Sequence, residues 1–235
     1  MICSFMIPIF SVKVDRLRLK YQPIHRLRIS SIEPNLLTNE TIDFVATSNS
    51  FVPHFHIPLQ SGDATILARM NRHYHPDFYR ELVLEATQRI PDLAVGADVL
   101  VGFPGETDDD FEILLHFLRE AQLDRVGCFQ YSPVEGARAN ALPDHVAPEL
   151  MQERWERFMD VQQAISAAKL QAKVGTTQEI LIDSVSAEGA LGRSTADAPE
   201  IDGQVHLPGI TDLAPGDFVE AEITAADEYD LFVES

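Results

Sequence analysis

Residues 94–107, AVGADVLVGFPGET, decide the fold of this chain. The first eight are almost all apolar, which predicts a buried strand. The next residues form a Gly-Pro turn, and Thr107 is a suitable N-cap for an amphipathic helix expected over 108–121. A strand, a tight turn and a helix are the repeating unit of α/β sheets. The VGFPGET turn therefore lies at the carboxyl end of a strand, where such sheets bind ligands.

The same alternation extends on both sides of this unit, through residues 26–175. Further segments are expected as strands at 27–29, 51–59 and 125–130, and as helices at 36–46, 64–70, 76–90 and 148–173. Repeated strand–helix units predict parallel strands with right-handed crossovers. Because only about four units are present, the chain is expected to form part of a TIM-like barrel and not a closed one.

The pattern changes after Gly175. Five short β-rich segments, at 178–183, 190–193, 204–207, 218–223 and 229–233, are separated by turns that contain Gly or Pro. This arrangement predicts a small β-barrel of the OB type over residues 176–235. The expected fold class is thus α/β followed by a small β-barrel, and residues 1–25 are left unassigned.

The charge is distributed unevenly. Residues 1–30 carry six Lys/Arg against Asp15, whereas residues 176–235 carry fourteen Asp/Glu against Arg193 alone, a net charge of −13. Such an acidic segment repels nucleic-acid phosphates and attracts a basic partner; alternatively, it only increases solubility. No apolar run reaches the roughly 18 residues of a membrane span. The two cysteines make no disulfide framework, so we expect a cytoplasmic protein.

The VGFPGET turn is a candidate ligand site, although not for phosphate. Its glycine spacing differs from that of phosphate loops, and Asp108, Asp109 and Asp110 occupy the first helical turn. These carboxylates stabilise the helix dipole but repel an anion. A cationic ligand, such as a sulfonium that also carries an ammonium group, fits the position better. The alternative is a capped turn without a ligand.

The segment 54–62, HFHIPLQSG, ends another expected strand. His54 and His56 share one face of a strand, as metal ligands do in some barrel hydrolases. No third ligand is defined, so packed or surface histidines are the favoured interpretation and no metal site is assigned. Gln60 and Ser61, at the end of the strand, could hydrogen-bond the polar atoms of a ligand.

Four blocks resemble, in order and spacing, the methylthiotransferases of the radical S-adenosylmethionine (SAM) superfamily: RLRISSIEP (26–34), HIPLQSG (56–62), MNRHY (70–74) and VGFPGET (101–107). This resemblance covers about residues 26–235. It implies the C-terminal part of a radical SAM barrel over 26–175, a TRAM domain over 176–235, SAM as cofactor and two 4Fe-4S clusters. By the same resemblance, the SAM pocket contains Gln60, Ser61, Gly102, Glu106, Glu33 and Arg72.

Each cluster of this family needs three closely spaced cysteine thiolates. Upstream of Arg26, where the family carries its cysteines, the chain does not resemble it. Cys3 and Cys128 stand 125 positions apart. We therefore expect neither cluster to form on this chain, assign no catalytic residue, and expect the chain to be inactive alone. Cys128 is expected to be an inert buried thiol.

From about residue 110 the resemblance narrows to the branch that methylthiolates an aspartate of a small-subunit ribosomal protein. It rests on LDRVGCF (123–129), YSPVEGA (131–137), ADAPEIDG (196–203) and DEYDLF (227–232). The TRAM domain of the family docks the substrate, and an acidic one favours a basic ribosomal protein over nucleic acid. The docking candidates are its acidic residues Asp197, Glu200, Asp202, Asp227, Glu228 and Asp230.

Three alternatives stay open. Residues 26–62 resemble the tRNA-modifying branches instead, so a tRNA methylthiotransferase fragment is one, and tight, salt-sensitive tRNA binding would favour it. A non-catalytic acidic binding module is another, favoured if the chain binds basic ribosomal protein but no SAM. The paired histidines would indicate a metallohydrolase if the protein held stoichiometric zinc.

Overall fold

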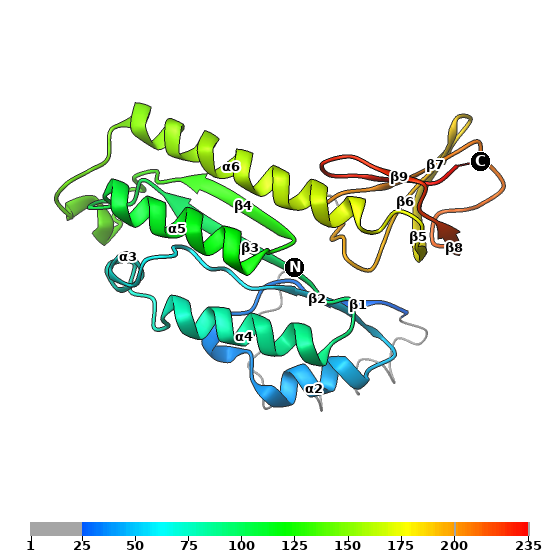
Figure 1. Cartoon of the computed structure of the whole chain (residues 1–235), viewed down its shortest axis with the longest axis horizontal. Helices are drawn as coiled ribbons and strands as arrows, with labels where there is room; N and C mark the ends of the chain where they lie inside the picture. Colours follow the sequence, from blue (N-terminus) through cyan, green and yellow to red (C-terminus); the bar gives the residue numbers. More distant parts are fainter. Residues whose placement is uncertain (1–24, 200, 235) are drawn as a thin grey trace.

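The computed structural model describes residues 25–199 and 201–234 (Figure 1). The segment left unassigned at 1–25, with Cys3, lies outside the described residues except for His25, and so does the docking candidate Glu200. None of the helices in the described ranges is long and apolar enough to cross a membrane.

The first half of the described chain is a four-stranded parallel sheet. Its strands lie in the order β1, β2, β3, β4, with bounds Leu27–Ile29, Phe51–His56, Ala94–Val101 and Arg125–Gln130. The connections contain η2 (Pro34–Leu36), α2 (Asn39–Thr47), α3 (Ala64–Arg69), α4 (Pro76–Arg89), α5 (Asp108–Ala121), η3 (Arg138–Ala141) and α6 (Pro148–Gln171). The predicted α/β fold with parallel strands is confirmed.

Two boundaries differ from the prediction for local reasons. The helix expected from Leu36 begins at Asn39, because 34–36 form a separate 3-10 turn and the Thr38 hydroxyl accepts the Thr41 amide as an N-cap. Strand β2 ends at His56 and not at Leu59. Its backbone nevertheless continues to donate hydrogen bonds to β3, from Ile57 to the Gly96 carbonyl and from Leu59 to the Asp98 carbonyl.

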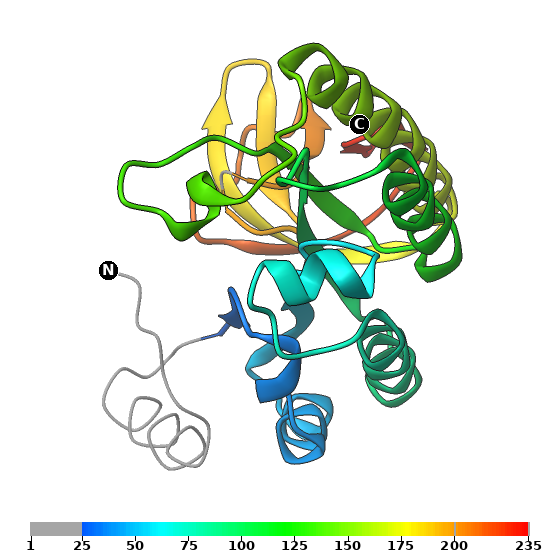
Figure 2. The same cartoon turned by 90° about the vertical axis from the view of Figure 1, so that its left-hand side faces the viewer.

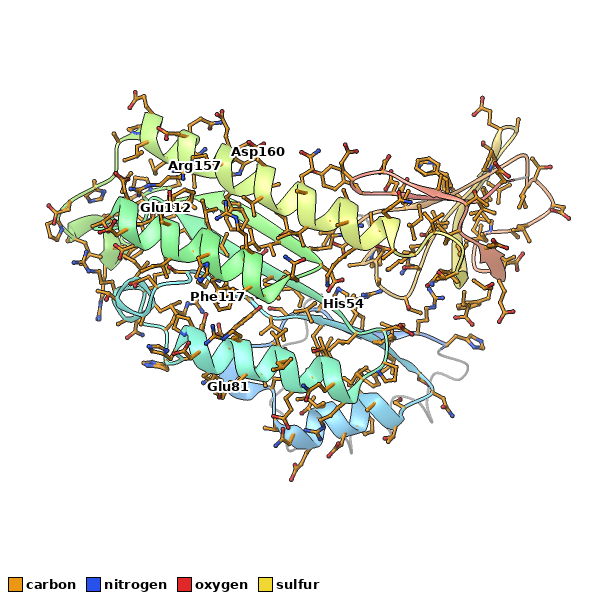
Figure 3. All side chains as sticks on the ribbon, in the orientation of Figure 1. His54, Glu81, Glu112, Phe117, Arg157 and Asp160 are labelled. Atoms are coloured by element: carbon orange, nitrogen blue, oxygen red, sulfur yellow. The ribbon has the colours of Figure 1, made fainter. Side chains whose placement is uncertain are left out.

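Helices α2, α4, α5 and α6 form an arc on the convex side of the sheet (Figure 2). The side chains of β3 alternate between the two faces of the sheet, which explains this arrangement. Val95, Val99 and Val101 are at most 1% exposed and share one core with these helices. Phe117 points into this core, whereas Glu112 and Arg157 lie on the outer surface (Figure 3). The intervening residues of β3, among them Asp98, face the opposite, concave side.

The second half is a curled six-stranded sheet, here called the β-domain. Its strands are ordered β8, β5, β6, β7, β10, β9, with bounds Phe218–Glu222, Thr177–Ser186, Gly189–Arg193, Val205–Pro208, Leu231–Phe232 and Ala225–Ala226. It has its own core, to which Ile180, Val205 and Leu207 contribute. Five strands were expected; the sixth is the two-residue β9, too short to give a periodic pattern.

The β-domain lies beyond the amino ends of the parallel strands (Figure 1). Helix α6 leads to it from the carboxyl end of β4, passing along the sheet on the way. The first strand residue of β4, Arg125, contacts the β-domain directly. The sheet therefore has two distinct ends: a carboxyl edge with open loops, and an amino edge that meets the β-domain.

Candidate functional site

Gln60 stands out at the carboxyl edge of the sheet. Its φ of 67° is left-handed, a conformation that costs a non-glycine residue about 1–2 kcal/mol. The amides of Leu59 and Gln60 both donate to the Asp98 carbonyl, at 3.1 and 2.8 Å, so the segment that continues from β2 along β3 bulges here. The half-buried Gln60 side chain has no hydrogen-bond partner among the described residues. Its amide is available to a ligand.

Two tyrosines fix this strained segment, and sequence reasoning did not identify either. The Tyr74 hydroxyl lies 3.1 Å from the carbonyls of both Pro58 and Leu59, and the buried Tyr79 hydroxyl donates to the Ile57 carbonyl at 2.7 Å. Burial raises the pKa of Tyr74 to about 12, so its hydroxyl stays protonated as a donor. Strain held by such surrounding bonds is typical of functional positions.

Ser61 is placed differently from Gln60. Its side chain is 2% exposed, and its hydroxyl accepts the Asp63 amide at 3.2 Å. Asp63 in turn caps α3 by accepting the amides of Thr65 and Ile66. Ser61 therefore shapes the loop that presents Gln60.

The VGFPGET turn is packed from within the chain. Gly102 and Gly105 have φ of 78° and 85°, which favours glycine. A Cβ on Gly102 would lie 2.2 Å from Met151 Cγ, and one on Gly105 would lie 1.5 Å from Arg69 Nη1. The groups that closely approach these glycines are side chains of α6 and α3.

Glu106 is the buried centre of this turn. Its carboxylate accepts the Gly102 amide at 2.9 Å and Arg154 Nη1 at 2.7 Å, and it is 6% exposed. Burial raises the pKa of Glu106, against the opposing effects of the Gly102 amide and Arg154. The 2%-exposed Arg154 also bonds Asp108 at 2.6 Å. Sequence reasoning missed Arg154, because one arginine on an amphipathic helix gives no signal of burial.

Glu33 and Arg72 are brought together at 2.6 Å. They come from the segments that follow β1 and α3, and both side chains are partly exposed. They do not bond Glu106, whose partners are Gly102 and Arg154. Of the six predicted pocket residues, Gln60 presents a free polar side chain, while the others already have partners within the chain or lack a polar side chain.

The two histidines of β2 share the concave face, as expected, but differ in environment. His56 lies 3.0 Å from Asp98, whereas His54 is 3% exposed and 4.0 Å from Asp202 of the β-domain (Figure 3). Burial is the main cause that lowers the pKa of His54 to about 3. In residues 25–199 and 201–234, no group of three His, Cys, Asp or Glu is arranged to hold a metal ion. Burial also raises the pKa of the Cys128 thiol to about 12.

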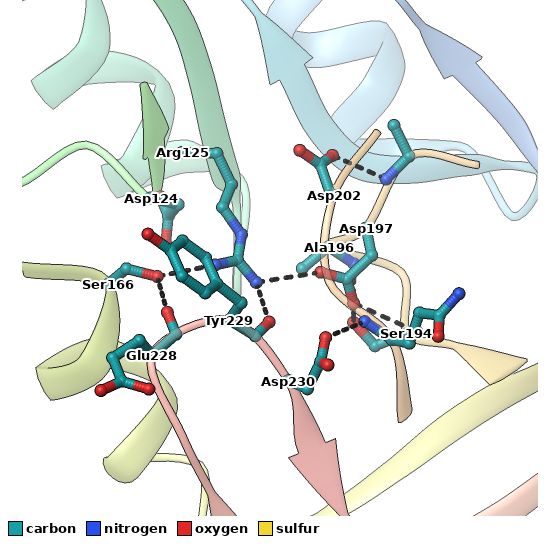
Figure 4. A network of polar contacts seen from close by, with 12 residues as sticks. Asp124, Arg125, Ser166, Ser194, Ala196, Asp197, Asp202, Glu228, Tyr229 and Asp230 are labelled. Carbon is teal, nitrogen blue, oxygen red and sulfur yellow. Dashed lines mark hydrogen bonds and ion pairs between the residues drawn. The ribbon is translucent and has the colours of Figure 1, made fainter. Parts of the chain in front are cut away.

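Arginines of the parallel strands join the amino edge to the β-domain. Arg125 donates to Ser166 Oγ at 2.6 Å and to the Tyr229 carbonyl at 2.7 Å, and Ser166 Oγ donates to the Glu228 carbonyl at 2.7 Å (Figure 4). Arg28 bonds the carbonyls of Thr195 and Asp197. Burial lowers the pKa of Arg28 to about 10, which leaves it charged at neutral pH.

The acidic residues predicted to dock a substrate largely have partners already, mostly within the β-domain itself. Asp197 is 5% exposed and accepts the Ser194 hydroxyl at 2.6 Å, and burial raises the pKa of Asp202. Asp227 accepts two backbone amides, which lower its pKa, and Asp230 accepts the Gln204 amide and faces His206. Only Glu228, of the five that the structure describes, has an exposed carboxylate without a hydrogen bond.

Comparison with known proteins identifies this architecture. Residues 8–118 match the radical SAM superfamily, and residues 174–235 match the TRAM domain. The chain is 49% identical over 206 residues to the ribosomal protein uS12 methylthiotransferase RimO of Hahella chejuensis, and 50% identical over 210 residues to that of Acinetobacter baumannii. The chain belongs to the radical SAM methylthiotransferase family. The superfamily match begins at residue 8, so the resemblance reaches further upstream than the sequence analysis found.

These alignments cover most of this chain but less than half of each relative. Both alignments cover 88% of this chain and 47% of the relative, so the chain spans about half the length of the curated relatives it matches. Among solved structures, the radical SAM enzyme coproporphyrinogen III oxidase (HemN) of Escherichia coli is similar with a TM-score of 0.59 at 16% identity. That match covers 92% of this chain and 50% of HemN, and it supports the fold alone.

Proposed function

We propose that this chain is part of a methylthiotransferase that adds a methylthio group to the β-carbon of an aspartate in ribosomal protein uS12. In this proposal residues 26–175 are the C-terminal part of the radical SAM barrel and residues 176–235 are the TRAM domain. The observation that carries it is the 49% identity to a uS12 methylthiotransferase over 206 residues, an alignment that includes 88% of this chain.

The chain's own residues do not fit an iron–sulfur cluster. The sequence holds two cysteines, Cys3 and Cys128, where each cluster needs three neighbouring thiolates. Cys128 is buried, and its raised pKa disfavours the thiolate that a metal requires. The thiolates must therefore come from outside this sequence, and this chain is not expected to complete the reaction alone.

The carboxyl edge of the sheet carries groups that support SAM as the ligand. Gln60 offers an unpartnered amide on a backbone held in a left-handed conformation, and the turn at Gly102 and Glu106 forms the adjacent wall. In this proposal Gln60 bonds a polar group of SAM, while Ser61 and the Glu33–Arg72 pair hold the loops around it. When bound, SAM supplies the methyl group of the methylthio product.

The charge of the β-domain supports a basic polypeptide as partner. Its net charge of −13 arises from fourteen Asp/Glu and one Arg. Although several of these acids are engaged at the seam, Glu188, Asp212, Glu220, Glu222 and Glu228 remain exposed. Such a surface accelerates the approach of a lysine- and arginine-rich protein in a salt-dependent manner and repels RNA.

The proposal is tested by binding of purified uS12 and of tRNA to this chain at low ionic strength. We expect uS12 to bind and tRNA not to bind. Replacement of three exposed acids of the β-domain, Asp212→Asn with Glu220→Gln and Glu222→Gln, should weaken uS12 binding several-fold. The matched control makes the same charge change on the barrel, Glu81→Gln with Asp109→Asn and Glu153→Gln, and should have little effect. Binding of tRNA without affinity for uS12 would overturn the assignment.

A second candidate is part of a tRNA methylthiotransferase. It is favoured by residues 26–34 and 56–62, RLRISSIEP and HIPLQSG, which resemble the tRNA-modifying branches. This candidate predicts the opposite binding result: the chain should bind tRNA, with an affinity that falls steeply as the salt concentration rises. The acidic β-domain argues against it, because phosphate neutralisation requires several cations and this domain has one, Arg193.

A further inference from the structure

The concave face of the parallel sheet carries a polar pair that the proposed cofactor site does not use. His56 Nε2 and Asp98 Oδ2 lie 3.0 Å apart, and their side chains are 26% and 36% exposed. Asp98 Oδ1 and His56 Nδ1 have no hydrogen-bond partner among the residues that the structure describes. One carboxylate oxygen is therefore free at the centre of this face.

Two glycines keep the floor around this pair free of side chains. A Cβ on Gly127 would lie 3.0 Å from Asp98 Oδ1 and 3.3 Å from the ring of Phe129. The carboxylate and the aromatic ring are thus neighbours across Gly127. A Cβ on Gly96 would likewise lie 3.1 Å from His56 Nδ1. Phe129 is 56% exposed, so its ring is accessible to a ligand.

Neither arginine of this face bonds Asp98. Arg28 bonds the carbonyls of Thr195 and Asp197, and Arg125 bonds Ser166 and Tyr229. Both are therefore held at the amino edge by the β-domain or by α6. Among the described residues, His56 alone forms an ion pair with Asp98. The free oxygen of Asp98 is consequently an acceptor without a cation of its own.

We propose that Asp98 and Phe129 form a binding site for an arginine or lysine side chain of the polypeptide substrate. The cationic group would bond Asp98 Oδ1, and its aliphatic stem or guanidinium plane would pack on the Phe129 ring. An anionic ligand is disfavoured by the Asp98 carboxylate. This inference rests on the proposed function and adds a specific contact to the long-range attraction of the β-domain.

The position suits a substrate that reaches the carboxyl edge. Asp98 precedes Val101, the last residue of β3, by three positions, which corresponds to about 10 Å along the strand. A basic residue bound there would leave a neighbouring part of the same polypeptide at the edge where Gln60 lies. The site would thus help to set which aspartate of the substrate is presented.

The test compares Asp98→Asn with Asp92→Asn in the full chain, by calorimetric titration with purified uS12 at low ionic strength. Asp92 is an exposed turn residue with φ of 56°, a conformation that asparagine tolerates, so both variants lose one charge without strain. We expect Asp98→Asn to raise the Kd about fivefold, as for a partly exposed ion pair, and Asp92→Asn to leave it nearly unchanged.

A second measurement locates the contact. A decapeptide of alternating glycine and arginine is titrated into the chain while the imidazole signals of His56 are followed by NMR, and a citrulline peptide serves as the uncharged control. The arginine peptide should shift the His56 signals, and the citrulline peptide and the Asp98→Asn variant should not show the shift. If wild type binds uS12 but Asp98→Asn binds equally and His56 does not respond, the inference is wrong. If wild type does not bind uS12, the proposed function fails, and the inference with it.

Discussion

The two edges of the parallel sheet differ in what their polar groups contact. At the amino edge, Arg28 and Arg125 bond β-domain carbonyls, and the carboxylates of Asp197 and Asp202 lie 3.6 Å from Arg125 and 4.0 Å from His54. At the carboxyl edge, Gln60 is held in a strained conformation with its side-chain amide free. Polar groups at the first edge therefore join the sheet to the β-domain, while the polar group at the second is available for ligand binding. Residue type alone does not separate the two roles.

The largest expected effect is at the turn beside the carboxyl edge. Arg154→Ala removes one partner of the buried pair and leaves Glu106 uncompensated, which should lower the free energy of unfolding by about 3–5 kcal/mol. Urea denaturation followed by circular dichroism measures this. Arg157→Ala, on the exposed side of the same helix, should cost less than about 1 kcal/mol. Equal losses in the two variants would mean that the Glu106 pair contributes nothing specific.

At the amino edge, Arg125→Ala should lower the free energy of unfolding by about 1.5–3 kcal/mol, because it removes charged hydrogen bonds to Ser166 and Tyr229. Limited proteolysis should then cleave between the β-domain and α6 faster than in wild type. Arg119→Ala, an exposed arginine of α5 without such bonds, is the control. Unchanged cleavage would show that Arg125 does not hold the domains together.

The buried His54 makes the seam sensitive to acid. The pKa of His54 is about 3 in the folded chain and about 6.5 in the unfolded chain. Below pH 6.5 the unfolded state therefore binds a proton at this residue that the folded state does not bind. Stability is complete above pH 6.5 and falls as the pH drops, by about 1.4 kcal/mol from this residue at pH 5.5. His54→Gln should flatten the stability–pH profile. His116→Gln, at an exposed histidine, should leave the slope unchanged.

The smallest expected effect tests whether the strain at Gln60 is functional. Gln60→Gly relieves the left-handed conformation and should stabilise the fold by about 0.5–1 kcal/mol while weakening SAM binding. Gln122→Gly, at the left-handed C-cap of α5, should stabilise the fold similarly without an effect on SAM. Thermal unfolding and titration with SAM measure both properties. SAM binding that survives Gln60→Gly would remove Gln60 from the pocket.

The architecture could be predicted from the sequence because hydrophobic periodicity marks the strands and helices, and turn and capping residues mark their ends. Buried β3 and the Thr107 cap were visible as an apolar run and a Thr-Asp boundary, and the structure has them at Ala94–Val101 and Thr107. The environment of the site was less predictable. Glu106 and Asp197 look like surface acids in the sequence, yet both are buried, and their carboxylates face Arg154 and Arg125, which come from distant segments. Such pairings follow from tertiary contacts and leave no local pattern.

Helix α6 sets the distance between the β-domain and the carboxyl edge of the sheet. Its first turns press Met151 and Arg154 against the VGFPGET turn, and Ser166 near its end bonds the β-domain. Its 24 residues have a length of about 36 Å. A protein gripped by the β-domain would therefore reach the other edge only through a projecting segment of about ten extended residues. A compact, rigid protein without such a segment could not extend from the β-domain to the carboxyl edge, whatever its charge.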